Sequence, residues 1–529
     1  MKLKTFVFAY KLALITFVAV YFPFAWISCS DVEGPEIVFI HTNDTHSQID
    51  GVYMDEKPVG GVLQRAALIE EMRASDPQLV YLDAGDMVQG SPYFNIWNGE
   101  LEMKLMNLQG LIASTFGNHE FDNGLAFMGN MLEYAAFPII SCNYDVKGTC
   151  LEKYVRKSMI IERKGIRIGI TGVTVDPNNL IFNRNWEGIR YIDPVKAVNK
   201  EAQKLRNDSC DLVVVLSHIG YYTNDSTGDR HLAANTRNVD LIIGGHSHTN
   251  LEDGETVLNL DGKPVMITQT AGKINPIGCV RVKMKKARNS EYGNRYEVAA
   301  IKCSKIHPDL HDLKKYGKTV SDFITPYHDS LDLKMNGILG SCATDLQRYR
   351  PQSPLGNFAS DALRTYGEKV YGKPMDIGLM NVGGLRNDLY VGDIKLGDIY
   401  RIFPFENTVT ILEMKGSDVE SLIHQMSGKL EALSGTRITL ATDSLGKTYA
   451  TEILVGGKNI DPDRIYYIAT IDYLAEGNDG LTALTRARKN VNTGILLRNM
   501  MIEYIQDLTA KGKSVESKLD DRVIVKKAE

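Results

Sequence analysis

The stretch Ile37-Val-Phe-Ile-His-Thr-Asn-Asp-Thr-His46 runs from four consecutive apolar residues into an aspartate and, two positions later, a histidine. A short apolar run of this kind is typical of a buried β-strand. Similar runs recur as far as about Lys305, and amphipathic stretches that predict helices separate them. The further strand-like runs are Leu79–Leu82, Ile166–Ile170, Leu212–Leu216 and Leu241–Ile243, and the helical stretches include Gly61–Ser75 and Asp193–Arg206. This alternation predicts an α/β domain with central sheets.

Carboxylate, imidazole and amide side chains follow four of these runs and a fifth short run, Leu111–Ala113. They are Asp44, His46, Asp86, Asn118, His119, Asp122, His218, His246 and His248. The carboxyl ends of the strands in an α/β sheet converge on one crevice, so we expect these side chains to meet there. A single residue of this kind is more often a loop cap, but the ordered set at successive strand ends is a strong signal.

The chemistry of this set favours a metal centre. Nitrogen and oxygen ligands without thiolate suit zinc, manganese, iron or cobalt. Two such ions about 4 Å apart clamp a phosphoryl group and lower the pKa of a bridging water. The sequence therefore predicts a site with two divalent cations that acts on a phosphate ester.

The same residues carry a family resemblance. The motifs Asp44-x-His46, Gly85-Asp86, Gly117-Asn-His-Glu120, His218 and Gly245-His-x-His248 resemble those of the calcineurin-like metallophosphatases. The longer forms His41–His46 and Gly117–Asp122 look like the 5′-nucleotidase branch, and the resemblance extends over about residues 35–525. It implies an α/β fold of two domains: a metallophosphatase β-sandwich flanked by helices (α/β/β/α), and a C-terminal α/β nucleotide-binding domain joined to it by a linker helix.

The resemblance also implies a role for each side chain. Asp44, His46 and His248 would hold one metal, Asn118, His218 and His246 the second, and Asp86 would bridge both. His119 would stabilise charge on the phosphate, and Asp122 would orient His119. Many members of the family have an amide residue at the position of His248. Imidazole is the better ligand for most of these ions, so we expect metal binding to persist, and the metal preference stays open.

The domain boundaries follow from the change in pattern along the chain. We expect a metallophosphatase domain over residues 34–308, an interdomain segment over 309–335 with a helix at Asp309–Leu333, and a substrate-binding domain over 336–526. The second domain should contain helices at Asn357–Gly367 and Asp418–Ser427 and several strands around Thr408–Met414.

Three segments of the second domain bear on substrate choice. Asn381-Val-Gly-Gly-Leu-Arg386 combines glycines that permit close backbone approach with a guanidinium that matches phosphate oxygens. Phe403–Asn407 and Asp472–Gly480 each present an aromatic ring that can stack on a base. Taken singly, the first segment is equally compatible with a tight turn, and each aromatic residue with core packing.

Here too the segments resemble the 5′-nucleotidase C-terminal domain. The resemblance implies that Phe405 and Tyr473 clamp the base, that Asp479 binds ribose and that Arg386 binds phosphate. The implied substrate-binding residues are Asn381, Gly383, Gly384, Arg386, Phe405, Asn407, Gly435, Tyr473 and Asp479, with Arg348 or Arg350 as a further cation. Tyr473 is commonly Phe in the family, and Glu406 and Asn478 stand where glycine is frequent, so base preference stays open.

The first residues read as a leader. Basic residues precede an apolar run from Leu12 to Ile27, which is typical of a signal peptide over residues 1–29 rather than of a retained membrane anchor. Ser28-Cys29 resembles a bacterial lipoprotein processing site, with Cys29 as the position of a lipid anchor. We therefore expect export to the periplasm, or to the outer membrane or cell surface as a lipoprotein.

Charge and cysteine content exclude some classes of function. The net charge of −5 argues against binding to DNA or RNA polymers or to an anionic membrane surface. Six cysteines follow the leader without a CxxC pair, so a structural zinc site is not expected. Disulfides and buried free thiols both remain open.

The expected function is hydrolysis of nucleoside 5′-monophosphates to nucleoside and phosphate by a hydroxide that two metals activate. On the same centre the alternatives are a nucleotide-sugar or dinucleotide pyrophosphatase, and a 2′,3′-cyclic-nucleotide phosphodiesterase with 3′-nucleotidase activity. An alternative of another class is an exported nucleotide-binding protein without turnover. Base, metal identity and oligomeric state do not follow from the sequence.

Overall fold

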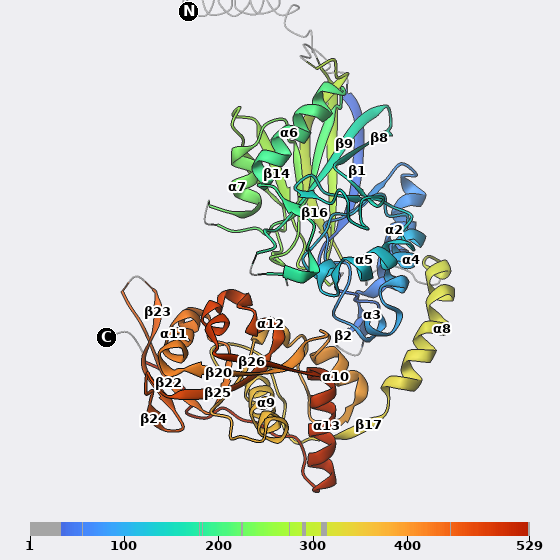
Figure 1. The fold of residues 1–529 in the computed structure, drawn as a ribbon. Coiled ribbons are helices and arrows are strands. Elements are labelled where there is room, and N and C mark those ends of the chain that lie inside the picture. The colour runs from blue at the N-terminus through green and yellow to red at the C-terminus, as the bar shows by residue number, and fades with distance from the viewer. Residues whose placement is uncertain are drawn as a thin grey trace, which may run out of the picture.

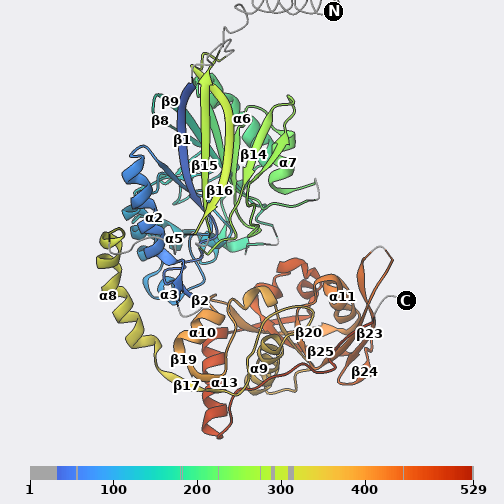
Figure 2. The same ribbon diagram turned by 180° about the vertical axis from the view of Figure 1, so that it is seen from behind.

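The computed structural model describes residues 33–54, 57–178, 180–181, 183–223, 226–273, 276–287, 292–307, 315–444 and 446–526. The expected signal peptide and Cys29 lie outside the described residues. Within them the chain forms two lobes, and the helix α8 (Lys318–Met335) connects the lobes along one side (Figures 1 and 2). In the part of the chain that is described, no helix is both long enough and apolar enough to cross a membrane.

Two mixed sheets packed against each other form the N-terminal lobe (Figure 2). The first has the strand order β16-β15-β1-β4, and the second has the order β13-β14-β12-β11-β9-β8. The first consists of β1 (Glu33–Thr42), β4 (Val80–Asp83), β15 (Ile277–Lys286) and β16 (Tyr296–Ile306). The second consists of β8 (Ser158–Arg163), β9 (Ile166–Thr174), β11 (Leu212–His218), β12 (Leu241–Gly244), β13 (Glu255–Leu258) and β14 (Pro264–Thr268). In each sheet, the strands that end at polar motifs run parallel: β1 beside β4, and β11 beside β12.

Apolar side chains on both faces of these strands explain why the two sheets pack on each other and are covered by helices. Ile37 and Phe39 of β1 pack with Val214 and Leu216 of β11 in the core between the sheets. Their neighbours along each strand face outward, because successive side chains of a strand point to opposite faces. The outward residues Val38 and Ile40 join the helices α2 (Gly61–Ser75), α4 (Glu100–Leu108) and α5 (Gly124–Leu132). Val213 and Val215 of β11 join α6 (Pro194–Asn207) and α7 (Gly228–Asn235).

The expected α/β/β/α architecture is therefore confirmed. The predicted helix Gly61–Ser75 has the observed bounds of α2, and Asp193 caps α6 by accepting a hydrogen bond from the backbone N–H of Lys196 at 2.9 Å. The prediction that Leu111–Ala113 is a strand is wrong, because this run makes only single-residue bridges: Ala113 bridges Leu82, and Ser114 bridges Ile139.

Short elements complete the N-terminal lobe. They are β2 (Val52–Met54), β3 (Lys57–Val59), β5 (Ile139–Ile140), β6 (Tyr144–Asp145), β7 (Val155–Arg156), β10 (Arg190–Tyr191), α3 (Pro92–Trp97) and the 3₁₀ turns η1 (His119–Phe121) and η2 (Asn183–Asn185).

The helix α8 lies where an interdomain helix was expected, but it begins later than Asp309. Residues 308–314 are not described, and the helix begins after Gly317, whose backbone N–H donates to Glu70 Oε2 at 2.7 Å. Val320 and Ile324 of α8 pack into a cluster with side chains of α2, α3 and α4. This cluster attaches α8 to the N-terminal lobe.

The C-terminal lobe is built on a five-stranded sheet of order β21-β18-β25-β20-β26. Its strands are β18 (Ile377–Met380), β20 (Thr408–Lys415), β21 (Ala432–Ser434), β25 (Ile465–Ile471) and β26 (Lys489–Leu496). The helices around it are α9 (Pro354–Tyr371), α10 (Leu396–Ile402), α11 (Gly416–Met426), α12 (Asp472–Ala475) and α13 (Leu497–Ala510). Its buried residues form a single cluster of their own.

A second sheet and several short elements surround this core. They are β22 (Thr436–Thr442), β23 (Thr448–Val455), β24 (Lys458–Asn459) and β27 (Val523–Val525) in the order β24-β23-β22-β27, the pair β17 (Ile338–Cys342) and β19 (Gly392–Lys395), and the 3₁₀ turns η4 (Val382–Gly384), η5 (Ser427–Lys429), η6 (Asn478–Gly480) and η7 (Thr482–Arg486). The six cysteines from Cys142 onward carry free thiols.

Because the two lobes have separate cores, truncating one core should destabilise mainly one lobe. Leu363 of α9 and Leu216 of β11 are both fully buried. We expect Leu363→Ala to lower the unfolding free energy of the C-terminal lobe by about 2–5 kcal/mol, and Leu216→Ala to do the same to the N-terminal lobe. Differential scanning calorimetry should show that each variant shifts a different transition. Equal shifts of one shared transition would contradict independent cores.

Candidate metal centre and substrate cleft

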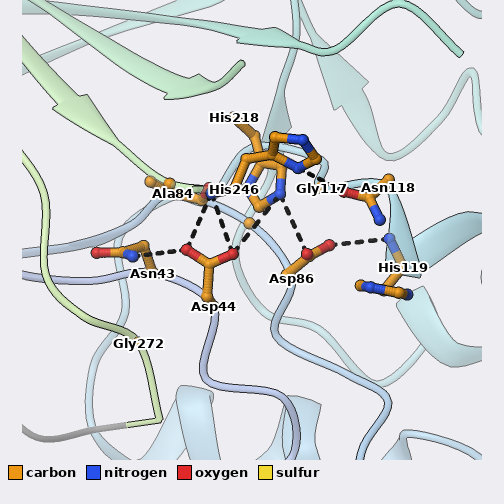
Figure 3. A network of polar contacts seen from close by, with 12 residues as sticks. Asn43, Asp44, Ala84, Asp86, Gly117, Asn118, His119, His218, His246 and Gly272 are labelled. Carbon is orange, nitrogen blue, oxygen red and sulfur yellow. Dashed lines mark hydrogen bonds and ion pairs between the residues drawn. The ribbon is translucent and has the colours of Figure 1, made fainter. Parts of the chain in front are cut away.

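Apart from Asn118, the predicted ligands follow parallel strands from both sheets of the N-terminal lobe. Figure 3 labels Asp44, Asp86, Asn118, His218 and His246 among them. Asp44 and Asp86 follow β1 and β4 of the first sheet, whereas His218 ends β11 and His246 follows β12 of the second. The two sheets thus bring their carboxyl ends to the same edge of the sandwich. The ligands come from five separate segments of the chain, with Asn118 supplied by the loop before η1.

The distances show that these side chains form one cluster. His218 Nε2 lies 3.1 Å from Asp86 Oδ2 and 3.8 Å from Asp44 Oδ1. His248 Nε2 lies 3.3 Å from Asp44 Oδ1 and 3.1 Å from His46 Nε2. Three overlapping groups have ligand atoms within 4.8 Å of one another: Asp44, His46 and His248; His46, Asp86 and His119; and Asp44, Asp86 and His218.

Two of the ligands expected for the second metal, the amide of Asn118 and the imidazole of His246, are also adjacent. His246 Nδ1 and Asn118 Oδ1 are 2.9 Å apart, and the backbone N–H of His246 donates to both carboxylate oxygens of Asp44 at 3.0 Å. All seven side chains predicted as metal ligands therefore lie in one cluster.

The buried carboxylates of this cluster require a neighbouring cation. Burial alone would raise the pKa of Asp86, yet the facing His218 and His119 hold it well below its usual range. Burial likewise disfavours the charged form of His218, but Asp86 and Asp44 outweigh it and raise the pKa of that imidazole to about 10. A divalent cation held by these residues would take the place of such a proton, since metal binding to histidine releases protons.

The donor set fits a metal ion. His218 Nδ1 lies 2.7 Å from the carbonyl oxygen of Ala84, which fixes the tautomer and directs the other ring nitrogen into the cluster. That nitrogen, Nε2, is buried and faces the carboxylates of Asp86 and Asp44, where a ligand atom for a metal is needed. Burial lowers the pKa of His246 to about 4, so its imidazole is neutral and able to coordinate.

The loops that present the ligands are tightly held. Glu120 is buried and accepts backbone N–H groups of Asp86, Met87 and Gly117 at 3.1, 2.8 and 2.6 Å. It thereby ties the loop after β4 to the loop that carries Asn118. Left-handed φ values are adopted by Asp44, His46, Asp86, His246 and His248. Such conformations cost energy and tend to cluster at functional sites.

His119 and Asp122 form the expected pair beside the cluster. Asp122 Oδ2 lies 2.8 Å from His119 Nδ1, and the backbone N–H of His119 donates to Asp86 Oδ1 at 2.8 Å. Burial opposes protonation of His119, but Asp122 and Asp86 raise the pKa of its imidazole. The ring of Phe405, from the other lobe, stacks on His119 with centroids 5.4 Å apart.

A cavity of about 640 Å³ joins the cluster to the C-terminal lobe. Of the residues predicted from sequence, those that line it are Asp86, Asn118, His119, Asp122, His246, His248, Asn381, Gly383, Gly384, Arg386, Phe405, Asn407, Tyr473 and Asp479. Arg350 lines it and Arg348 does not, which separates the two candidates for the further cation. Both clamp rings therefore face the space next to the metal cluster.

Polar contacts hold the C-terminal side of the cavity in place. Asp479 accepts hydrogen bonds from Asn381 Nδ2 at 2.9 Å and from the Tyr473 hydroxyl at 3.2 Å. Arg386 reaches across to the N-terminal lobe, where its Nη2 lies 3.3 Å from His46 Nε2. Its guanidinium also lies 5.4 Å from the centre of the Phe405 ring.

The structure does not bring Gly435 to this cavity. Gly435 lies between β21 and β22 with a φ of 79°, and it lines another hollow beside Arg364 and Arg522. A Cβ at this position would lie 2.0 Å from the carbonyl oxygen of Asp376. Close packing of the backbone thus accounts for this glycine.

Several lining residues were not predicted from the sequence. They are Gln89, Asn123, Leu180, Ile181, Arg184, Ser247, Glu406, Lys429 and Asp472. Arg184 extends from η2 toward the C-terminal lobe, where it lies 3.8 Å from Asp472 and 3.5 Å from Glu476. No local sequence motif predicts a role for Arg184. Gln89 and Ser247 lie within three residues of predicted ligands, and this closeness in sequence could have identified them as residues of the site.

The glycine before Asn118 is required by crowding against Asp86. A Cβ at Gly117 would lie 2.0 Å from Asp86 Oδ1, whereas a Cβ at Gly428 would meet nothing within 4 Å. We expect Gly117→Ala to displace Asp86 and to weaken metal affinity by roughly 10- to 100-fold, as changes next to a ligand do. Calorimetric titration with Mn²⁺ should show this loss, while Gly428→Ala binds as the unmodified protein does. Unchanged affinity in Gly117→Ala would contradict the site.

Comparison with known proteins agrees with this geometry. Residues 37–250 match the family model of the calcineurin-like phosphoesterases, and residues 336–486 match that of the 5′-nucleotidase C-terminal domain. The trifunctional nucleotide phosphoesterase protein YfkN of Bacillus subtilis (strain 168) is 25% identical over 92% of this chain. The alignment covers 35% of YfkN, so this chain spans about a third of its length.

Two other matches extend over nearly the whole of both chains. An apyrase of Tabanus yao is 27% identical, and the alignment covers 88% of this chain and 90% of the relative. The crystal structure of a 5′-nucleotidase precursor from Thermus thermophilus superposes with a TM-score of 0.82 at 26% identity, covering 93% of this chain and 99% of that one. Since both family models match in order along one fold, the chain belongs to the 5′-nucleotidase family of phosphoric ester hydrolases, with a calcineurin-like phosphoesterase domain followed by a 5′-nucleotidase C-terminal domain.

Proposed function

We propose that the protein hydrolyses nucleoside 5′-monophosphates to nucleoside and inorganic phosphate. The observation that supports this most is the single cavity that is lined at once by Asp86 and His248 of the metal cluster and by Phe405 and Tyr473 of the aromatic pair. A nucleotide has the same two parts, a phosphate ester and a flat base. A nucleotide therefore offers one part to each of the two chemistries that the cavity brings together.

The metal cluster serves the phosphate ester. In this proposal Asp44, His46 and His248 hold one divalent cation, Asn118, His218 and His246 hold a second, and Asp86 contacts both. Zinc, manganese, iron and cobalt all suit these donors. Two such cations polarise a phosphoryl group and supply a water of lowered pKa.

Protein side chains around the cluster bind and orient the phosphate. His119, whose imidazole pKa is raised by Asp122 and Asp86, places a ring N–H group beside the transferring group, where it would offset negative charge. Arg386 adds a guanidinium that matches two phosphate oxygens. Arg386 lies close to His46, and Phe405 stacks on His119, so side chains of the C-terminal lobe border the phosphate site directly.

The C-terminal lobe binds the nucleoside. Phe405 and Tyr473 stack on the base, an interaction worth about 1 kcal/mol for each ring pair beyond the buried area. Asp479 keeps acceptor capacity for the ribose hydroxyls, because a carboxylate has about four lone-pair sites and the two contacts from Asn381 and Tyr473 use only part of them. Asn407 supplies a polar contact at the base, and the backbone of Gly383 and Gly384 allows close approach.

A substrate panel tests this function. We expect phosphate release from AMP or GMP that a chelator abolishes and added Mn²⁺ restores. Tyr473→Ala should lower kcat/KM by roughly 10-fold through lost stacking, while Tyr473→Phe retains most of it. Asp86→Asn should lose turnover. If the protein only binds nucleotides, the unmodified protein should release no phosphate from any substrate, and Asp86→Asn should leave nucleotide binding unchanged.

Other members of the panel distinguish the alternatives. UDP-glucose and NAD report on pyrophosphatase activity, and 2′,3′-cyclic AMP reports on the cyclic phosphodiesterase. Hydrolysis of one of these with AMP and GMP inert would exclude the 5′-monophosphate function and leave the metal centre intact.

We also propose that residues 1–29 direct export and that Cys29 carries a lipid. The basic start, apolar run and Ser28-Cys29 of the leader support this. Mass spectrometry of the mature protein, expressed in a bacterium that processes lipoproteins, should find an acylated Cys29 as the first residue. Cys29→Ala should remain unacylated. An unmodified N-terminus that includes the leader would rule the proposal out.

A further inference from the structure

The amide of Gln89 is buried beside the metal cluster without a protein partner. Its side chain is 1% exposed, and neither Nε2 nor Oε1 makes a hydrogen bond. Gln89 nevertheless lines the cavity that contains Asp86 and His248. A buried amide that lacks partners destabilises the folded protein, since its groups have lost water without replacing it. A ligand or water in the cavity would supply the missing partners.

The backbone holds this side chain in place. Gln89 has a φ of 66°, a left-handed conformation that glutamine rarely adopts. The loop that carries it is bonded to the loop after β1, where the backbone N–H groups of His46 and Ser47 donate to the carbonyl oxygens of Asp86 and Met87 at 3.0 Å. Strained backbone held by surrounding contacts is characteristic of functional positions.

The surroundings of Gln89 favour an oxyanion as the ligand. The guanidinium of Arg386 lines the same cavity, and the metal cluster would add positive charge when it is loaded. A neutral amide fits such a ligand, because its N–H group donates a hydrogen bond without adding charge. A tetrahedral oxyanion, such as inorganic phosphate or the phosphoryl group of a monoester, offers several acceptor oxygens.

We propose that Gln89 binds the phosphoryl group of the substrate, with Nε2 donating a hydrogen bond to a non-bridging phosphate oxygen. The inference rests on the proposed function and adds a residue to its phosphate site. The unpaired amide of Gln89 thus lowers the stability of the protein with an empty cavity. The same amide raises the affinity of the protein for phosphate.

A second buried glutamine provides a matched control. Gln109 is 3% exposed, but its Oε1 accepts from Arg65 Nε at 2.5 Å and its Nε2 donates to the carbonyl oxygen of Leu105 at 3.1 Å. It does not line the cavity. Both glutamines are therefore buried to a similar degree, and they differ in whether the protein itself satisfies the amide.

The test compares Gln89→Met with Gln109→Met in protein saturated with Mn²⁺. Without phosphate, Gln109→Met should lower the melting temperature, whereas Gln89→Met should leave it unchanged or raise it, because only the unpaired amide is removed. With inorganic phosphate, the affinity of Gln89→Met should fall by roughly 10- to 100-fold, the loss expected for one hydrogen bond to a charged group. Gln109→Met should bind phosphate as the unmodified protein does.

A second variant separates a hydrogen bond from a change of shape. Gln89→Glu keeps the shape of the side chain and replaces the donor by a carboxylate that repels oxyanions, so it should weaken phosphate at least as much as Gln89→Met. Phosphate affinity within about threefold of the unmodified protein in both variants would overturn the proposal, a margin below the loss of one hydrogen bond to a charged group.

Two further outcomes would also overturn it. One is a loss of Mn²⁺ affinity with phosphate binding at saturating Mn²⁺ unchanged, which would make Gln89 a metal ligand. The other is a fall in melting temperature equal to that of Gln109→Met, which would make it structural. The titrations require no nucleotide, so they decide the role of Gln89 even if no nucleoside monophosphate is hydrolysed.

Discussion

Two carboxylates, Asp44 and Asp86, lie buried next to each other at the meeting point of two sheets, and His218 contacts both. Burying negative charge without compensation is strongly unfavourable, so this arrangement depends on a cation at its centre. In the protein without metal, protonated His218 supplies that charge, as the raised pKa of its imidazole indicates. Divalent cations supply more charge and engage the same atoms. The remaining features of the site follow from the need to keep these groups together.

Holding the like charges of Asp44 and Asp86 close together is unfavourable in free energy, and contacts in several surrounding loops offset this. Ligand-bearing residues adopt left-handed backbone conformations, and Glu120 fastens two of the loops through backbone N–H groups. The parallel strands β1, β4, β11 and β12 anchor these loops in the core of the sandwich. Thus the rigidity of the sheets, more than any single contact, determines where the ligands lie. The C-terminal lobe then closes the open side of the cluster with Phe405 and Arg386.

Much of this could be predicted from the sequence because its signals are local. Apolar runs predicted the strands β1, β4, β9, β11 and β12, the periodicity of Gly61–Ser75 predicted α2, and short motifs predicted the metal cluster. Other features depend on contacts between distant segments. Ala113 forms a bridge in place of a strand, and Arg184 meets Asp472 only because the lobes face each other. Gly435 has a positive φ, which favours glycine. Close packing against the backbone of Asp376, rather than contact with a base, accounts for the glycine at this position.

Anomalous X-ray scattering can test whether two cations lie beside these carboxylates. Crystals grown with Mn²⁺ or Zn²⁺ should be measured on both sides of the absorption edge of the metal. We expect two anomalous peaks about 4 Å apart, both within coordination distance of Asp86. The absence of any peak near Asp86 at saturating metal, or a peak bound by none of the seven predicted ligands, would contradict it.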